Sequence, residues 1–314
     1  MPVLDPAGPH AAGIVRYWWL TFWVSVVVLG AVSIVLVYAI LRRRSSGSLP
    51  APFTPDHERG TAIGVSIATA LTVVTLLVLL TGSVLTSRAL SSSDPHNALT
   101  IQVTGNQWWW DVEYQDPKPA RRVRTANEIH IPVGRPVLIR TRSRDVIHSF
   151  WVPALNGKKD NIPDHPSSVW LKAERPGVFA GQCAEFCGYQ HAHMRLLVTA
   201  EPADVFDAWL TAQRAVAPEP MDPVARRGRD VFLAGSCALC HTILGTPAGA
   251  RTGPDLTHLA SRTTLGAGTM PNTIGHLAGW IVDPQGVKPG ARMPATSVGA
   301  DDLQALLAYL GSLR

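Results

Sequence analysis

The chain has 314 residues, of which 46% are hydrophobic and only 16% are charged, and its net charge at pH 7 is +5. This length allows two or three domains, and the charged fraction is low for a purely soluble protein. The positive charge is diffuse, with no long basic run after the apolar N-terminal third, which argues against a nucleic-acid-binding protein.

Two uncharged stretches near the N-terminus predict a transmembrane hairpin. Residues 17–41 and 60–87 contain no charged side chain, and each exceeds the roughly 20 residues that cross a bilayer as a helix. The first stretch opens with Tyr17, Trp18 and Trp19, aromatic residues that favour the membrane interface. We expect spans at about 17–41 and 62–86 within a hairpin domain of residues 1–97. The alternative is a pair of buried globular helices.

The basic residues between the spans predict the orientation of the hairpin. Arg42, Arg43, Arg44 and Arg59 lie in this short connection, which the positive-inside rule places in the cytoplasm. Both termini, and everything after Arg88, then lie on the outer face, which is the periplasm of a bacterial inner membrane. A cleaved signal peptide is the alternative for the first span, but that span lacks a basic start and a clear cleavage site.

Residues 98–214 have the pattern of a small all-β domain. Short apolar or alternating runs stand between turn residues and predict strands at 99–103, 128–132, 137–141, 169–173 and 196–199. A helix over about 203–214 closes this block. The proline-rich residues 215–223 then predict a linker.

The four cysteines of the chain fall into two short motifs, and the first motif favours copper. Cys183 and Cys187 are followed by His191 and Met194, which together form a soft sulfur and nitrogen ligand set. Zinc would seldom recruit a methionine. A further imidazole is needed, and we expect it from His148, where an apolar strand ends. The alternative is a Cys183–Cys187 disulfide with incidental neighbours, although four residues close a strained ring.

The segment GQCAEFCGYQHAHM at 181–194 resembles the dinuclear copper (CuA) loop of subunit II of cytochrome c oxidase. Matching stretches are GNQWWW at 105–110 with Glu113 and Tyr114, DVIH at 145–148, and NIP at 161–163. Together with the hairpin, the resemblance covers nearly all of residues 14–200. It implies that the β domain has a cupredoxin-like fold.

The resemblance also implies roles for individual residues. Its implied copper ligands are the thiolates of Cys183 and Cys187, the imidazoles of His148 and His191, the thioether of Met194 and the backbone carbonyl of Glu185. The Glu185 carboxylate would face a magnesium or manganese ion shared with the catalytic subunit. His193 competes with His191, but its spacing departs from the family pattern.

Two further positions have weaker support. Trp108 matches the exposed tryptophan at which electrons enter from cytochrome c in this family, whereas Trp109 and Trp110 would pack between the copper domain and a membrane partner. A purely structural role for these tryptophans is the alternative. Glu58 resembles an acid at the mouth of a proton channel, but the sequence around it fits poorly, which favours a solvated acid near a helix start.

The second cysteine motif, Cys237-Ala-Leu-Cys240-His241, predicts covalent attachment of a c-type haem. The two thiols add to the vinyl groups, and His241 becomes an axial ligand of the iron. A zinc half-site is the alternative, but no second cysteine pair is left in the sequence to complete it. Helical patterns at 225–233 and 301–313 resemble the terminal helices of class I cytochromes c. Residues 224–314 are therefore expected to form an all-α cytochrome c domain.

A methionine is the expected sixth ligand of the iron, and two Met-Pro pairs compete for this role. Met293 is favoured over Met270 because the stretch around it resembles the methionine loop of cytochromes c. His258 and His276 remain alternatives, although lone loop histidines are usually surface residues.

Taken together, the motifs indicate a caa3-type subunit II, an oxidoreductase and translocase subunit without an oxygen-reducing site of its own. Electrons would pass from cytochrome c or another donor through the haem and the copper pair to subunit I, with subunit III as a further partner and with proton translocation. A CuA-type nitric oxide reductase subunit and a membrane-tethered carrier without an oxidase partner are the alternatives. A quinol oxidase subunit is disfavoured because the copper ligands are present.

Overall fold

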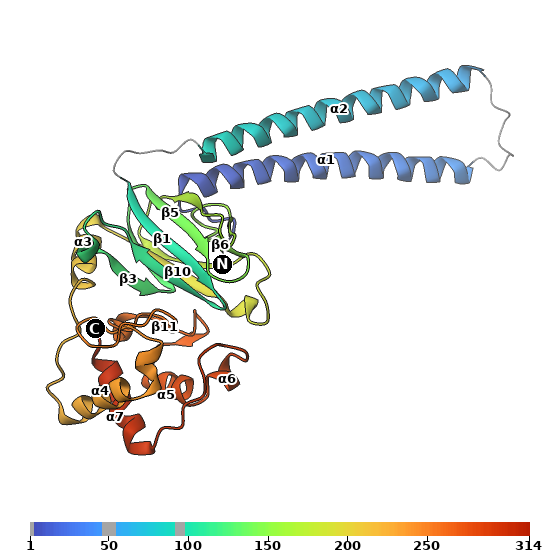
Figure 1. The fold of residues 1–314 in the computed structure, drawn as a ribbon. Coiled ribbons are helices and arrows are strands. Elements are labelled where there is room, and N and C mark those ends of the chain that lie inside the picture. Colours follow the sequence, from blue (N-terminus) through green and yellow to red (C-terminus); the bar gives the residue numbers. More distant parts are fainter. Residues whose placement is uncertain (1–2, 46–54, 92–97) are drawn as a thin grey trace. The chain divides into compact units, whose positions relative to one another are not determined.

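The computed structural model describes residues 3–45, 55–91 and 98–314. These residues form two compact units (Figure 1). One unit is the helical hairpin of residues 12–93, and the other contains the N-terminal segment up to residue 11 together with everything after residue 93.

The helical unit consists of α1 (Pro9–Ser45) and α2 (Pro55–Ser91). Both helices are long and apolar enough to cross a membrane, over Pro9–Arg42 and Glu58–Leu90. Their apolar side chains are exposed instead of forming a core, which excludes the alternative of two buried globular helices. The Tyr17 hydroxyl donates to the Leu79 carbonyl oxygen at 3.0 Å and so connects the two helices. Most of the connection on which the orientation depends, residues 46–54, lies outside the described residues.

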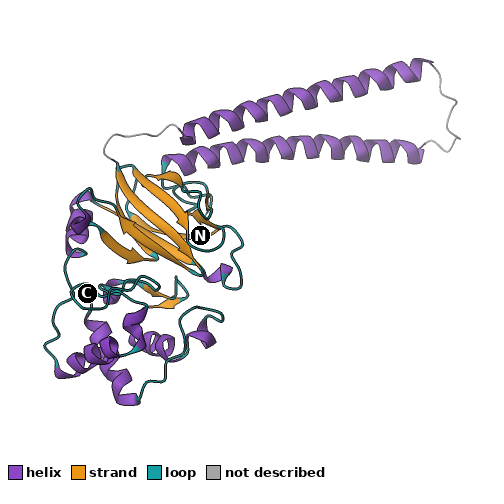
Figure 2. Cartoon of the chain, viewed as in Figure 1, coloured by secondary structure: helices purple, strands orange, loops and turns teal. Residues whose placement is uncertain are grey.

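Two five-stranded sheets form the predicted all-β domain (Figure 2). In spatial order, the first sheet contains β3 (Val123–Ala126), β2 (Trp109–Tyr114), β1 (Leu99–Asn106), β5 (Val137–Ser143) and β8 (Ser167–Leu171). The second sheet contains β4 (Glu128–Pro132), β10 (Arg195–Glu201), β9 (Gly177–Cys183), β6 (His148–Trp151) and β7 (Lys159–Asn161). The mixture of parallel β1–β5 and β4–β10 pairs with antiparallel neighbours is that of a cupredoxin-like sandwich.

Apolar side chains from both sheets fill the space between them. Ile101, Val103, Ile139 and Val198 are fully buried and alternate with more exposed neighbours along their strands, which is the period-two pattern of a sheet with one buried face. This core holds the sandwich rigid beneath the loop that follows β9. The helix α3 (Ala203–Ala212) comes directly after β10 and buries Phe206.

The segment before α1 belongs to the sandwich and not to the hairpin. The Ala7 amide donates to the Ala154 carbonyl at 2.7 Å, and the Glu174 amide donates to the Ala7 carbonyl at 2.8 Å. Ala7 is consequently buried in the sandwich core.

The C-terminal domain is helical, as its patterns predict. Its helices are α4 (Pro223–Ala234), α5 (Ile274–Val282), α6 (Pro284–Val287) and α7 (Ala300–Ser312), with a small ribbon of β11 (Thr264–Leu265) and β12 (Met270–Pro271). The Asp222 carboxylate caps α4 by accepting from the amides of Val224 and Ala225. The helices α4 and α7 cross closely at Gly228, where a Cβ atom would overlap the carbonyl of Ala305. This crossing supports the Cys237–His241 motif, which follows α4 closely in the chain.

Candidate copper and haem sites

The loop after β9 gathers soft donor atoms at one end of the sandwich. The Cys183 and Cys187 sulfurs lie 3.7 Å apart, and Cys187 Sγ lies 3.6 Å from His191 Nδ1 and 3.8 Å from Met194 Sδ. The Glu185 carbonyl oxygen is 3.2 Å from Cys183 Sγ. Five of the six expected copper ligands thus come from one loop of twelve residues. Both cysteines are free thiols, so the disulfide alternative is not realised.

His148 is the sixth expected ligand and reaches the same cluster from β6. Its Nδ1 lies 3.9 Å from Cys183 Sγ, while its Nε2 lies 2.8 Å from the carboxylate of Asp145. A carboxylate on the far nitrogen of an imidazole is the usual arrangement that orients a metal-binding histidine. The ring is fully buried, and Gly105 lies so close that a Cβ there would meet the ring at 2.5 Å. The pocket around His148 therefore permits only one ring position.

The electrostatics of this cluster favour one negatively charged sulfur beside one protonated sulfur. The contact with Cys187, together with the bonds to His148 and to backbone groups, lowers the pKa of Cys183 to about 3 against the opposing effect of burial. The same sulfur contact, with burial, raises the pKa of Cys187. Burial opposes the charged form of His148, but Asp145 and Cys183 raise its pKa overall. The two close sulfurs share one proton, and a soft cation that bound both of them would displace it. This set of sulfur and nitrogen donors fits copper.

The other sequence candidates near this loop have different surroundings. His193 is exposed, and its Nδ1 bonds to the Gln190 side-chain oxygen at 2.7 Å, away from the sulfurs. Glu185 is half-buried. Trp108, which matches the exposed entry tryptophan of the family, is buried in this chain with only 9% of its surface accessible, and the residues around Gly290 lie against its ring. Its indole nitrogen donates to the Cys187 carbonyl oxygen at 2.9 Å.

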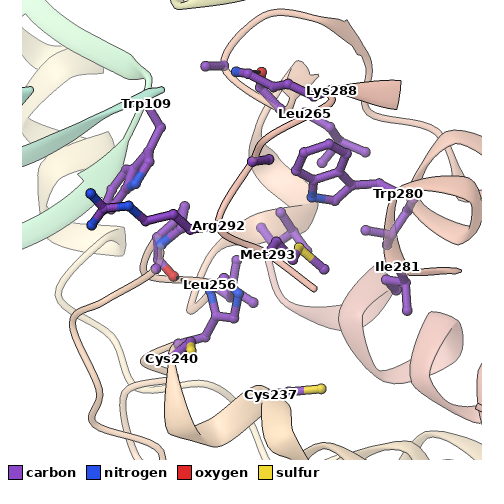
Figure 3. A pocket seen from close by; sticks show the side chains of 18 of the residues that line it. Trp109, Cys237, Cys240, Leu256, Leu265, Trp280, Ile281, Lys288, Arg292 and Met293 are labelled. Carbon is purple, nitrogen blue, oxygen red and sulfur yellow. Dashed lines mark hydrogen bonds between the residues drawn. The ribbon is translucent and has the colours of Figure 1, made fainter. Parts of the chain in front are cut away.

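The second cysteine motif lies in a large apolar pocket (Figure 3). Cys237, Cys240, His241 and Met293 all line this pocket, and most of the remaining lining is apolar. In Figure 3, Cys237 and Cys240 lie at the opposite side of the pocket from Lys288, with Met293 between them. An apolar cavity with two thiols, an imidazole and a thioether along its walls fits a covalently attached haem.

The orientation of His241 fits a role as an iron ligand. Its Nδ1 bonds to the Pro254 carbonyl oxygen at 2.7 Å, and because a carbonyl only accepts, Nδ1 carries the proton and Nε2 remains a ligand atom. Burial lowers the pKa of this imidazole, which keeps it neutral. Gly253 allows this placement, since a Cβ at that position would meet the ring at 2.7 Å.

The two methionine candidates lie in different places. Met293 lines the pocket, whereas Met270 pairs with Leu265 in the β11–β12 ribbon and packs against the helical core. His258 bonds through Nδ1 to the C-terminal Arg314 carbonyl, and His276 bonds to Thr273 at the start of α5. Neither histidine lines the pocket.

Several residues of the two sites were not foreseen from the sequence. Arg262 lines the haem pocket with a buried Nε that has no hydrogen-bond partner, and it offers a donor to an anionic group in the pocket. Asp145 stands three residues before His148 inside a motif already singled out, and this spacing could have identified it. Part of the pocket wall also comes from the sandwich, at residues 107–109 and Asn127, and no local pattern predicts this contact.

Comparison with known proteins assigns both domains. Residues 116–201 match the family described as cytochrome C oxidase subunit II, periplasmic domain, and residues 225–314 match cytochrome c. Cytochrome c oxidase subunit 2 of Alkalihalophilus pseudofirmus is 36% identical over 100% of this chain and 91% of its own length. The Bacillus subtilis protein of the same name is 28% identical over 100% of this chain and 92% of its own.

Several solved structures are similar to part of the chain. The periplasmic domain of subunit II of cytochrome oxidase from Bradyrhizobium japonicum is 30% identical, with a TM-score of 0.36, over 38% of this chain and 96% of that domain. The full-length similarity, the fold and the two cysteine motifs agree. The chain therefore belongs to the cytochrome c oxidase subunit 2 family and carries a fused cytochrome c domain.

Proposed function

We propose that this chain is the electron-input subunit of a caa3-type haem-copper oxidase. Covalent haem c and a dinuclear copper centre, when bound, supply the one-electron chemistry that links an external donor to subunit I, where dioxygen is reduced to water with proton translocation. The observation that carries this proposal is the presence, in one membrane-anchored chain, of a cluster of six sulfur, nitrogen and oxygen ligands and a pocket lined by the CxxCH motif.

At the copper site, the residues hold charge and exclude water. Copper would be held by the side chains of Cys183, Cys187, His148, His191 and Met194 and by the Glu185 carbonyl, and it would supply one-electron transfer. His148 and Met194 are fully buried and both sulfurs nearly so, which limits the rearrangement that accompanies a change in charge. Asp145 holds the His148 ring in place.

At the haem site, Cys237 and Cys240 would hold the haem covalently, and His241 and Met293 would bind its iron. The Pro254 carbonyl orients His241, and Arg262 offers a donor to a haem carboxylate. Trp108 is proposed as a residue on the path of electrons to the copper loop, because it lines the haem pocket and donates to the Cys187 carbonyl.

The remaining assignments concern the surroundings of the chain. The two apolar helices and the family make it a membrane protein with an extracellular domain that assembles with subunit I. We place both termini on the periplasmic side of a bacterial inner membrane. Subunit III, a cytochrome c donor and an ion held by the Glu185 carboxylate are further proposed partners. The proposed domains are residues 1–97, 98–214 and 224–314, with 215–223 as the linker.

Affinity purification of the tagged chain from membranes tests this function. We expect a polytopic haem-containing subunit to co-purify and the complex to consume dioxygen with a reduced donor. Reduction of nitric oxide in place of dioxygen would favour a nitric oxide reductase. Recovery of the chain without any haem-containing membrane subunit would favour a tethered carrier.

A further inference from the structure

Two buried charged side chains cross between the sandwich and the haem domain in opposite directions. Glu128, at the start of β4, reaches the haem domain, and Lys288, just after α6, reaches the sandwich. Their relative exposures are 7% and 2%. Charged groups are seldom buried to this extent unless they are paired or fully hydrogen-bonded, so each requires an explanation.

Glu128 accepts hydrogen bonds from two adjacent residues of the haem domain, Thr263 and Thr264. One carboxylate oxygen accepts from the Thr263 and Thr264 amides, both at 2.9 Å, and from their hydroxyls at 2.8 and 3.1 Å. Hydrogen bonds to an ionised acceptor are stronger than neutral ones and are lost together if the domains separate. This carboxylate therefore specifies where the segment before β11 lies on the sandwich.

Lys288 makes the reciprocal contact. Its Nζ donates to the carbonyl oxygens of Trp108 at 2.8 Å and His193 at 2.7 Å in the sandwich, and of Gly266 at 2.8 Å in its own domain. These three acceptors match the three donors of an ammonium group. Burial lowers the pKa of Lys288 to about 7, so the three carbonyls are needed to offset the cost of removing this cation from water.

The contacts of Lys288 join the segments that carry the two ligand sets. Lys288 stands five residues before Met293, and one of its acceptors, His193, directly precedes Met194. Trp108, another acceptor, donates in turn to the Cys187 carbonyl oxygen. A neighbouring bond, from the side-chain Nε2 of Gln190 to the Pro289 carbonyl oxygen at 2.8 Å, connects the same two loops.

We infer that Glu128 and Lys288 form a reciprocal clasp, in which each acts as a positioning residue that fixes the haem domain against the copper loop for electron transfer. The role in electron transfer rests on the proposed function, whereas the clasp itself does not. Residues 107–109 form part of the wall of the haem pocket in this arrangement, so the clasp also closes that side of the pocket.

Hydrogen–deuterium exchange on the full chain, with and without metals, tests the clasp directly. The reporters are the Thr263 and Thr264 amides, which donate to Glu128. In Glu128→Gln and in Lys288→Met, we expect exchange at these amides to accelerate by about tenfold or more as the domains separate locally. The matched controls Glu113→Gln and Lys118→Met change the same residue types on the sandwich, and their exchange should equal that of the wild type.

Flash photoreduction of the metal-loaded chain measures the rate of electron transfer from haem to copper, and so tests whether the clasp sets that rate. We expect haem-to-copper transfer to slow by about tenfold or more in both clasp variants, while the haem and copper spectra stay unchanged. Thr263→Val, which removes one hydroxyl donor, tests the same contact if Glu128→Gln fails to fold.

Two outcomes would overturn the inference, and a third concerns only the proposed function. If the Thr263 and Thr264 amides of both clasp variants exchange at the wild-type rate, there is no clasp. Faster exchange with an unchanged transfer rate would show that the clasp does not set the transfer position. Failure of the wild-type chain to take up haem or copper would instead count against the proposed function, and the exchange measurement on the metal-free chain would still decide the clasp.

Discussion

Cys187 contacts three other members of the sulfur cluster, since its Sγ lies within 3.8 Å of donor atoms of Cys183, His191 and Met194. We expect Cys187→Ser to abolish the paramagnetic signature of the copper pair while the haem absorption remains, because the two ligand sets are separate. Paired optical and paramagnetic spectra check this. His193→Asn is the control and should keep the copper signature, and its loss there would show that the ligand is misassigned.

The axial methionine provides a second test at a single residue. Met293 lines the haem pocket and Met270 does not. Met293→Leu should remove the methionine-to-iron absorption band and lower the haem potential, because a thioether ligand raises that potential. Met270→Leu should change neither quantity. The opposite pattern in a redox titration of the two variants would reassign the ligand.

Residues inside short motifs could be predicted from the sequence, and residues that act across domains could not. Cysteine, histidine and methionine spacing led to the copper loop and to Cys237–His241. Met270 and Met293 share the same Met-Pro context, and the resemblance around Met293 favoured it before the pocket showed which of the two lines the wall. Glu128 and Lys288 each contact residues more than 90 positions away. No local pattern encodes such a contact.

At the level of elements, the α4–α7 crossing depends on one glycine. A side chain at Gly228 would overlap the Ala305 carbonyl, whereas Gly279 in α5 has open space around it. We expect Gly228→Ala to lower the free energy of unfolding of the haem domain by about 1–3 kcal/mol through overpacking. Gly279→Ala should be neutral or slightly stabilising. Denaturant unfolding followed by haem absorption measures the free energy of unfolding of both variants. Equal changes in the two variants would contradict a close α4–α7 contact at Gly228.

Many of the elements were predicted from their period, whereas β2, β3, β6, β7, β9 and α5 were not. The strands β1, β4, β5, β8 and β10 and the helices α3, α4 and α7 lie close to their expected ranges. The strand β9 begins with one glycine and contains another, and β7 has only three residues, all polar, so neither shows an apolar alternation. Such strands exist because their neighbours in the sheet supply the hydrogen bonds.

At the level of the whole molecule, Lys288 predicts a pH dependence with a definite sign. Burial lowers its pKa to about 7, against 10.5 for a free lysine. Between these values the unfolded chain binds more protons than the folded chain, so the free energy of unfolding should rise with pH. Denaturant titrations at pH 7 and pH 9 should show a larger rise for the wild type than for Lys288→Met. An equal rise in the free energy of unfolding for the two proteins would contradict a lowered pKa of Lys288.

The fused arrangement also predicts how transfer responds to salt. The haem domain is joined to the sandwich through residues 215–223 and through buried contacts, so its encounter with the copper loop needs no diffusion. Exposed charges are screened at high ionic strength, whereas buried contacts are screened far less. The haem-to-copper rate should therefore change little between low and high salt. A steep fall would indicate docking through exposed charges.

The central claim is that one chain holds both a haem and a copper pair, and metal analysis combined with paramagnetic resonance of the purified full chain tests it most directly. The ligand sets predict about two coppers and about one covalent haem per chain, with one unpaired electron shared between the coppers. A chain that keeps no copper after reconstitution, or that binds a single copper with an unshared electron, would contradict the account.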